Sequence, residues 1–252
     1  PRPGEAHAPD RRDGVRRDVI RAGRSPEPGE RQAVATKQAR QKAREAREEL
    51  YRQLVLDAAG RIFADKGYDD AKMGQIAEAS GLSLQTLYSV FPGKAHIYHA
   101  IHETGDRELH QLVTESARGI TDPLAALLAG LRATTRYFLE HPDFLRMRLH
   151  GGFTWGSEAS AAGHRGRTES WRAALAMLRA SCRRCIEAGV LVDRDPRLMA
   201  RMMVAMQQVE LAWWLEGGMQ GDVDRVLADV EQQVERAFRR RPDDATAPGP
   251  EA

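Results

Sequence analysis

The sequence contains little cysteine, few aromatic residues and no long apolar run. Only 2 of its 252 residues are Cys, and Phe, Trp and Tyr together make up 6%. Cys182 and Cys185 cannot form a disulfide framework or complete a four-ligand zinc site by themselves, so we expect reduced thiols. No run of about 18 apolar residues occurs, and the Arg- and Asp-rich N-terminal segment has no apolar stretch of the signal-peptide type. We therefore predict a cytoplasmic protein without a membrane span.

Pro and Gly are concentrated at the ends and in short connections, whereas Leu, Ala, Arg and Glu dominate elsewhere. This composition favours helices and argues against an all-β sandwich. Apolar residues recur at three- and four-residue steps, so we predict an all-α fold of about nine helices. The predicted helices are one from about Gln38 to Gly67, two short ones at 73–79 and 83–89, one starting at Lys94, and five at about 122–140, 142–150, 167–188, 195–216 and 222–239.

Charge is distributed unevenly, although the net charge is only +2. Residues 1–44 carry 12 Lys and Arg against 6 Asp and Glu, residues 45–110 carry 7 against 11, and residues 111–252 carry 19 against 19. Nucleic-acid binding must therefore be argued from a local motif rather than from overall charge. Residues 1–35 have almost no large apolar side chains, and we predict a disordered basic tail whose arginines either bind DNA backbone or are simply solvated.

The most specific signal lies in residues 54–98, where two short amphipathic segments flank a tight turn. Gly81 permits a left-handed turn, and Ser83 can cap the second segment. Two short helices that cross at such a turn are typical of a helix-turn-helix, with an ordinary helical hairpin as the alternative. Leu87, Val90 and Phe91 are predicted to face inward, which leaves a polar outer face available to DNA.

Several residues at fixed spacing carry a family resemblance in this region: Ala58, Ala59 and Phe63, Gly67 and Tyr68, Ile76 and Ala77, Ser80 to Ser83, Thr86 to Tyr88, and Phe91 and Pro92 followed by Lys94. With them the segment resembles the TetR family of one-component transcriptional repressors. The resemblance covers about 45 of the 252 residues. It implies an N-terminal three-helix domain that holds the helix-turn-helix, and a larger helical C-terminal domain that binds an effector and dimerises.

The candidate DNA-binding residues lie on and around the second short segment: Lys72, Ser83, Leu84, Gln85, Thr86, Tyr88, Ser89 and Lys94. Gln85 can pair with an adenine edge, and Thr86 can approach a base or a thymine methyl group. The resemblance implies a phosphate contact for Tyr88. Lys72 and Lys94 stand at the starts of helices, where a cation and backbone N–H groups favour a phosphate.

Some positions depart from the residues that are common in the family: Lys72, Gly74, Leu84, Gln85, Ser89, Val90 and Gly93. Base preference therefore cannot be transferred from relatives. Gly74 lowers helix propensity by roughly 1 kcal/mol relative to Ala. The negative charge of the predicted reading domain also departs from the family, and the basic tail could supply the missing attraction.

The resemblance implies a DNA-binding domain at 36–110 and an effector-binding and dimerisation domain at 111–240. The composition predicts a disordered basic tail before them at 1–35 and a disordered polar tail after them at 241–252. Aromatic and Met side chains of the second domain are core residues first, and they also suit an adaptable apolar effector pocket. The candidate pocket residues are Phe138, Met147, Trp155, Trp171, Met177 and Trp213. Arg136, Arg146 or Arg148 could receive an anionic ligand group, although Arg on a helix usually faces water.

The last two predicted helices, at 195–216 and 222–239, resemble in place and length the pair that forms a dimer interface in this family. The first of them has one apolar line from Leu198 to Trp213 and further apolar residues off that line: Met199, Met203, Leu211 and Trp214. One line suffices for a core, so the second stripe is predicted to serve an isologous dimer.

Other sites are less well supported by the sequence. The pair Cys182 and Cys185 fits packed thiols or a redox sensor, and the scattered His residues do not form a convincing metal site. No nucleophile–base pair, Gly-rich phosphate loop or paired carboxylates stand out, so we expect no catalytic residues, no metal and no cofactor. The sequence thus predicts a homodimeric repressor that reads a palindromic DNA operator and is released by a small, largely apolar effector. A non-specific DNA-binding or architectural module is the alternative.

Overall fold

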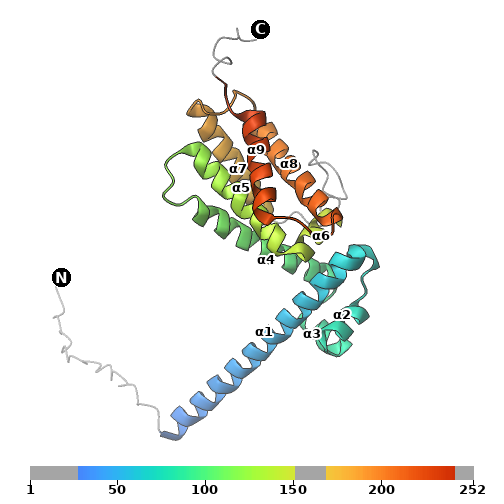
Figure 1. Ribbon diagram of the computed structural model, residues 1–252. Helices are drawn as coiled ribbons and strands as arrows, with labels where there is room; N and C mark the ends of the chain where they lie inside the picture. Colours follow the sequence, from blue (N-terminus) through green and yellow to red (C-terminus); the bar gives the residue numbers. More distant parts are fainter. Residues whose placement is uncertain (1–27, 151–168, 242–252) are drawn as a thin grey trace, which may run out of the picture. The chain divides into compact units, whose positions relative to one another are not determined.

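The computed structural model describes residues 28–150 and 169–241, and these residues form nine helices and no strand. The helices are α1 (Pro28–Asp70), α2 (Met73–Ser80), α3 (Leu84–Val90), α4 (Lys94–Ser116), α5 (Pro123–Glu140), α6 (Pro142–His150), α7 (Glu169–Glu187), α8 (Pro196–Glu216) and α9 (Val223–Phe238) (Figure 1). The predicted all-α class is confirmed. None of the helices in the described ranges is long and apolar enough to cross a membrane.

The chain divides into two units, Pro1–Ala46 and Arg47–Ala252. Helix α1 begins at Pro28, inside the segment 1–35 that was predicted to be disordered. Pro is tolerated in the first turn of a helix, and the Ala, Gln and Arg residues that follow are good helix formers, which explains the earlier start. The helical run breaks at Gly67, whose φ of 75° is left-handed, as the sequence predicted for the end of this helix.

The starts of the later helices follow their capping residues. Asp122 Oδ1 accepts a hydrogen bond from the backbone N–H of Ala125 at 2.8 Å, and Pro123 occupies the first turn of α5. Asp195 and Asp222 cap α8 and α9 in the same manner. Each cap satisfies a backbone donor that the first helical turn leaves without an intrahelical partner.

Helices α5, α7, α8 and α9 lie side by side with α4 in the larger unit (Figure 1), and they share a core around Leu131, Met203 and Phe238. Cys182 and Cys185 are buried in this core, and Cys182 Sγ lies 3.8 Å from the sulfur of Met203. Burial raises the pKa of the Cys182 thiol to about 12 and that of Cys185 to about 11. Because thiolates are the reactive form, this environment favours packed thiols over a redox sensor.

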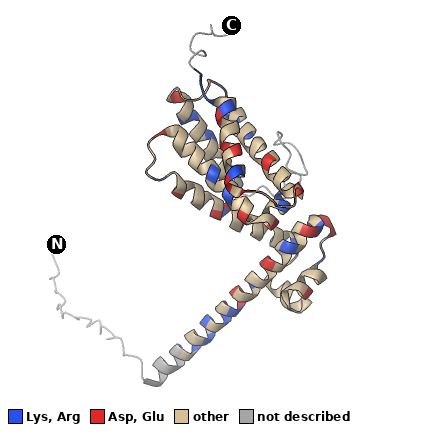
Figure 2. Cartoon of the chain, viewed as in Figure 1, with Lys and Arg blue, Asp and Glu red and all other residues tan. Residues whose placement is uncertain are grey.

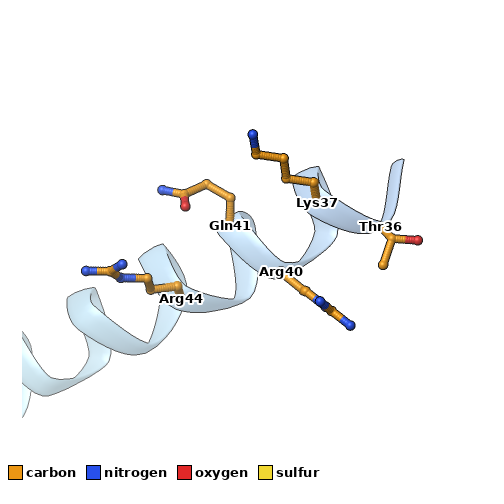
Figure 3. Close-up of a pocket in the computed structure, with 5 residues that line it drawn as sticks. All are labelled: Thr36, Lys37, Arg40, Gln41 and Arg44. Carbon is orange, nitrogen blue, oxygen red and sulfur yellow. The ribbon is translucent and has the colours of Figure 1, made fainter. Parts of the chain in front are cut away.

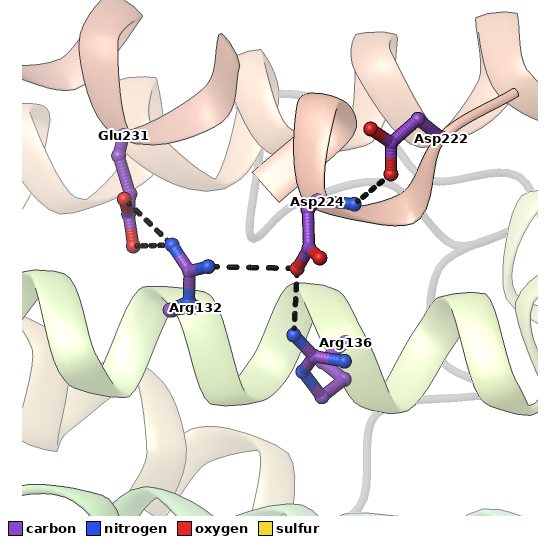
Figure 4. Close-up of polar contacts among 5 residues, drawn as sticks. All are labelled: Arg132, Arg136, Asp222, Asp224 and Glu231. Atoms are coloured by element: carbon purple, nitrogen blue, oxygen red, sulfur yellow. Dashed lines mark hydrogen bonds and ion pairs between the residues drawn. The ribbon is translucent and has the colours of Figure 1, made fainter. Parts of the chain in front are cut away.

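Polar contacts join α5 to α9 along one edge of this bundle. Arg132 donates to both carboxylate oxygens of Glu231 at 3.0 and 3.1 Å, and Arg136 donates to Asp224 at 3.1 Å (Figure 4). Asp222 accepts a hydrogen bond from the backbone N–H of Asp224 and so fixes the start of α9. Arg136 therefore has an acidic partner within the protein, which corrects its prediction as a receiver for an anionic ligand group.

Helices α4 and α6 approach closely at Gly105. A Cβ atom at this position would lie inside contact distance of the Phe144 ring. Gly105 therefore allows close packing of the two helices. The predicted domain boundary at residue 110 falls within α4, whose Tyr98 and Leu109 belong to different core clusters.

Candidate nucleic-acid interface

The first half of the larger unit has its own apolar core beneath α2 and α3. Its fully buried members include Phe63 of α1, Ile76 of α2 and Leu87 of α3. Tyr98 of α4 packs edge-on against Phe63 and Tyr68, with ring centroids 5.2 and 5.0 Å apart. This aromatic cluster fixes α4 against the end of α1 and provides the support on which the two short helices rest. We call residues 47–101 with this core the reading head.

The turn between α2 and α3 adopts the geometry that the sequence predicted. Gly81 has a φ of 69°, and the backbone N–H of Leu82 donates to the carbonyl of Ala77 at 3.0 Å. Ser83 Oγ then accepts from the backbone N–H of Thr86 at 3.0 Å and caps α3. A left-handed glycine with a Ser cap two residues later allows one helix to end and the next to start within three residues.

Helix α3 presents one face to the core and the other to solvent. Leu87 is fully buried and Phe91 is nearly so, whereas Leu84, Gln85 and Tyr88 are exposed. Tyr88 keeps 50% of its surface accessible. A fully buried anchor beneath exposed side chains able to contact bases and phosphates is what a helix needs to enter a major groove.

The hydroxyl groups on α3 already make local hydrogen bonds. Ser83 Oγ and Thr86 Oγ1 lie 2.8 Å apart, and Ser89 Oγ donates to the carbonyl of Thr86 at 2.6 Å. These bonds stabilise a helix of only seven residues, and they occupy part of the hydrogen-bonding capacity of the three side chains. Gln85 and Tyr88 therefore stand out as the polar side chains best placed to contact DNA.

Lys94 has an internal role that the sequence did not reveal. Its ammonium donates to the carbonyls of Tyr68, Asp69 and Ala71 at 2.7, 2.9 and 3.0 Å, and it lies 4.6 Å from the centroid of the Tyr68 ring. An ammonium has three N–H donors, and all three are used. This corrects the prediction that the Lys94 side chain offers a free cation to a phosphate. It neutralises the carbonyl end of α1 instead.

Lys72 lies at the start of α2 and is exposed. Its backbone N–H donates to Gln75 Oε1 at 3.2 Å. This is one of the two hydrogen bonds of a capping box, the one in which the side chain of the third helical residue accepts from the backbone of the cap. Gln75 thus compensates for the absence of the usual Ser or Thr cap. The Lys72 side chain remains the predicted phosphate contact on this helix.

Predicted effector residues are not gathered in one place. Met147 of α6 is buried in the reading-head core, and Tyr98 Oη donates to its carbonyl at 3.5 Å. Phe138 belongs to a different cluster, in which its ring stacks on Phe144 with centroids 6.0 Å apart. Met177 is partly buried on α7. Trp155 and the side chain of Trp171 lie outside the described residues.

Trp213 is 73% exposed on α8, which corrects its prediction as a lining residue of an interior pocket. Its neighbour Trp214 is buried with Leu211, and Leu198 and Val209 are exposed. The two stripes of α8 are therefore exchanged relative to the sequence prediction: the stripe with Met199, Met203, Leu211 and Trp214 is core, and the line from Leu198 to Trp213 is surface. Helical periodicity identifies two apolar faces, but it cannot say which one the other helices cover.

Helix α6 also brings buried charges against α4. Arg148 forms an ion pair with Asp106, and both side chains are almost fully buried. His102 lies beside them, 4.4 Å from the Tyr98 ring, and burial together with the Arg148 charge lowers the pKa of His102 to about 3. Arg148 and Arg146 both have carboxylate partners, which corrects their prediction as anion receivers. His102 and Asp106 stand four residues apart and therefore share one face of α4, which is the signal in the sequence for this buried cluster.

Comparison with known proteins agrees with this geometry. Residues 55–101 match the family model for bacterial regulatory proteins of the tetR family. The HTH-type transcriptional activator FasR of Mycolicibacterium smegmatis is 27% identical over 194 residues, which cover 74% of this chain and 81% of FasR. FasR is a transcriptional regulator by name, and the similarity extends well beyond the helix-turn-helix.

Solved structures show the same fold. The TetR family regulator PfmR from Thermus thermophilus has a TM-score of 0.58 and 27% identity, over 72% of this chain and 97% of PfmR. FadR from Bacillus subtilis, solved in complex with stearoyl-CoA, has a TM-score of 0.61 and 16% identity, over 72% of this chain and 96% of FadR. With its helix-turn-helix at α2 and α3 and these relatives, the chain belongs to the TetR family of transcriptional regulators.

Proposed function

We propose that this protein is a ligand-responsive regulator that binds a palindromic DNA operator as a homodimer and releases it when a small molecule binds. The observation that carries the proposal is the two-sided character of α3, with Leu87 buried and Gln85 and Tyr88 exposed. In this proposal α3 enters the major groove. Its exposed residues would distinguish one sequence from another, and its surroundings would hold the phosphates.

Individual contacts follow from side-chain chemistry. Gln85 would pair with an adenine edge, Leu84 would pack on a thymine methyl group, and Tyr88 would donate to a phosphate. Ser83, Thr86 and Ser89 would contribute through the hydrogen-bonding capacity that their local bonds leave unused. Lys72 would supply a cation, and at Lys94 the contact would come from backbone N–H groups at the start of α4 rather than from the ammonium.

The exposed stripe of α8 supports the homodimer. Leu198, Val209 and Trp213 are 44%, 57% and 73% exposed, and partly buried Met202 and Met206 lie between them. An apolar line of this length on a helix surface is costly in water and is a common sign of an interface. In a two-fold dimer through α8 and α9, each subunit would cover the other's stripe.

A sedimentation experiment tests the dimer. We expect Trp213→Glu to convert the protein to a monomer, because a buried, unpaired carboxylate at the interface is strongly unfavourable. Gln111→Glu, an exposed position on α4, adds the same charge and is the matched control. A Trp213→Glu protein that still sediments as a dimer would place the interface elsewhere.

A second aromatic cluster, which lies between α5, α6 and α8, supports an effector site near Phe138. The partly buried Met177 is a further candidate for this site. Phe138, Tyr137 and Phe144 pack together in this cluster, and Trp214 belongs to it. Among the described residues, Trp214 Nε1 and both ring nitrogens of His102 are buried without a hydrogen-bond partner. An effector with an apolar body and a polar group would satisfy the requirements of such surroundings.

Helix α6 gives such a site a route to the reading head. Phe144 and Leu145 of α6 belong to this second aromatic cluster, whereas Met147 is packed in the core beneath α2 and α3. An effector that displaces Phe144 would shift α6, which contacts α4 both at Phe144 and at Arg148. Two dimer geometries with different affinity for the ligand would then differ in the spacing of their two α3 helices.

An anisotropy titration tests effector release. Stearoyl-CoA is the first probe, because the related FadR structure contains it, and free CoA is the control that lacks the apolar chain. Release of a selected operator by stearoyl-CoA alone would identify an acyl chain as the recognised group. If neither compound changes DNA affinity, stearoyl-CoA is excluded as the effector.

Activation is the second candidate outcome of DNA binding, because FasR is named as a transcriptional activator. In vitro transcription from a promoter that carries the selected operator separates the two. Lower RNA yield with added protein supports repression, and higher yield supports activation. A non-specific architectural module would give neither, and its binding would show no sequence preference.

A further inference from the structure

The N-terminal part of α1 is a polar helix with a concentrated positive charge. Residues 36–44 contain four cations and no carboxylate: Lys37, Arg40, Lys42 and Arg44. Every described side chain from Thr36 to Ala46 is exposed. Figure 2 shows Lys and Arg positions in blue along this part of α1. A helix segment that buries no apolar surface gains nothing from core packing, so its stabilisation comes from contacts along the helix or with a partner.

Three of these cations share one side of the helix. Lys37, Arg40 and Arg44 are spaced by three and four residues, and together with Thr36 and Gln41 they line one hollow of the surface (Figure 3). In Figure 3 the three cationic side chains extend away from the helix axis. Lys42 is two residues from both Arg40 and Arg44 and does not line this hollow. We call Lys37, Arg40 and Arg44 the basic face.

Like charges at these spacings repel one another. Arg40 and Arg44 stand at i and i+4, and Lys37 and Arg40 stand at i and i+3, which are the spacings at which helical side chains are neighbours. Such pairs destabilise an isolated helix by a few tenths of a kcal/mol each. A polyanion beside the face would remove this repulsion, because each phosphate can pair with one cation.

The reading head lacks the charge that DNA binding requires. Between residues 47 and 101 there are six Lys and Arg against seven Asp and Glu, and the ammonium of Lys94 is bonded to carbonyls. The electrostatic part of DNA affinity comes from Lys and Arg that neutralise phosphates. A head with net negative charge needs such cations from another part of the same chain.

We propose that the basic face binds the phosphate backbone of double-stranded DNA and supplies sequence-independent affinity to the reading head. The inference rests on the proposed DNA-binding function and adds the source of its electrostatic attraction. Because both parts belong to one chain, binding by either raises the effective DNA concentration for the other. The basic face sets how tightly DNA is held, and α3 sets which sequence is held.

The salt dependence of binding gives the expected size of the effect. Each neutralised phosphate contributes a slope of about −0.9 to the dependence of log affinity on log salt concentration. Three contacts per protomer therefore contribute about −2.7. Between about 50 and 200 mM salt, this part of the slope corresponds to a loss of affinity of about 40-fold per engaged protomer.

The test compares the full chain with a triple variant, Lys37→Gln, Arg40→Gln and Arg44→Gln. Anisotropy titrations use a labelled duplex of scrambled sequence and a selected operator over the same salt series. We expect the triple variant to bind both duplexes with a slope shallower by about 2.7 per protomer and with unchanged base preference. Gln is a good helix former, so the helix is retained, and circular dichroism checks this.

Single variants provide the matched control. Arg40→Gln and Lys42→Gln remove the same charge from the same helix, but only Arg40 lies on the basic face. Of these two single variants, we expect only Arg40→Gln to make the dependence of log affinity on log salt concentration shallower. Equal reductions in both variants, or an unchanged slope in the triple variant, would overturn the proposal while leaving the proposed regulator intact.

Two further outcomes are distinguishable. If wild-type protein fails to bind any duplex at low salt, the proposed function itself fails, and the basic face loses its role with it. If wild-type protein binds vesicles of anionic phospholipid, and the triple variant loses that binding while it retains full DNA affinity, the face belongs to a membrane surface and the DNA assignment is wrong.

Discussion

Substitution of Lys94 by Met separates the structural role of this residue from the DNA contact that its position suggests. Met retains most of the length and the apolar stem of Lys, but it has no ammonium. The three carbonyls at the end of α1, from Tyr68, Asp69 and Ala71, would lose their charged donor. We therefore expect the reading head to lose stability even in the absence of DNA.

The size of the effect follows from the three hydrogen bonds. A hydrogen bond to a charged group contributes about 1.5–3 kcal/mol net, but the bonds made by one ammonium are not additive. Water can also replace the donor at Asp69, where the bond is exposed. We expect the free energy of unfolding to fall by about 2–3 kcal/mol in total. For a chain of this size that change lowers the melting temperature by about 4–12 °C.

Urea denaturation followed by circular dichroism measures this loss, and the same samples are titrated with the selected operator. Lys72→Met is the matched control, because it removes the same charge from an exposed position at the start of the neighbouring helix. We expect Lys72→Met to leave stability within about 0.5 kcal/mol of wild type and to weaken DNA binding. If Lys94→Met keeps full stability and weakens only DNA binding, the reasoning is refuted and the ammonium belongs to a phosphate.

Three other predictions concern the packing of the larger unit. The buried His102 beside Arg148 has a pKa lowered to about 3, so the folded protein keeps it neutral. As the pH falls below the pKa of about 6.5 in the unfolded chain, only the unfolded state binds the proton, and the free energy of unfolding falls. Between about pH 8 and about pH 5, urea titrations should show that wild type loses about 2 kcal/mol more of this free energy than His102→Gln. Gly105→Ala should lower the unfolding free energy by about 1–3 kcal/mol through overpacking, whereas Gly60→Ala, with open space around it, should raise it by up to about 1 kcal/mol. At about pH 8 a maleimide should label native Cys182 no faster than the protein unfolds, because burial raises its thiol pKa; rapid labelling would contradict that burial.

Local chemistry explains why much of the fold was predictable from the sequence. The cap at Ser83, the left-handed turn at Gly81 and the Asp-Pro start of α5 each depend on residues within four positions of one another. Such signals are complete within the sequence. The helix-turn-helix could therefore be located, and the burial of Leu87 and the exposure of Gln85 could be expected from it.

The features that the sequence did not predict depend on contacts between distant segments of the chain. Lys94 meets carbonyls that lie 23 to 26 residues before it, and no local pattern indicates those partners. The exposure of Trp213 depends on which side of α8 the other helices cover, and periodicity alone is the same for either side. Gly105 is similar, because its neighbour Phe144 comes from another helix. In all three cases the surroundings of the residue are set by side chains and backbone groups from other segments of the fold.

Selection of DNA from a random pool by the purified protein tests the central claim, that α3 reads DNA sequence, most directly. The selection is made in parallel with wild type and Gln85→Ala. We predict that wild type enriches an inverted repeat, and that Gln85→Ala enriches a repeat with an altered base at one position in each half-site. Failure of wild type to enrich any motif at low salt, or an identical motif and affinity for Gln85→Ala, would contradict the account.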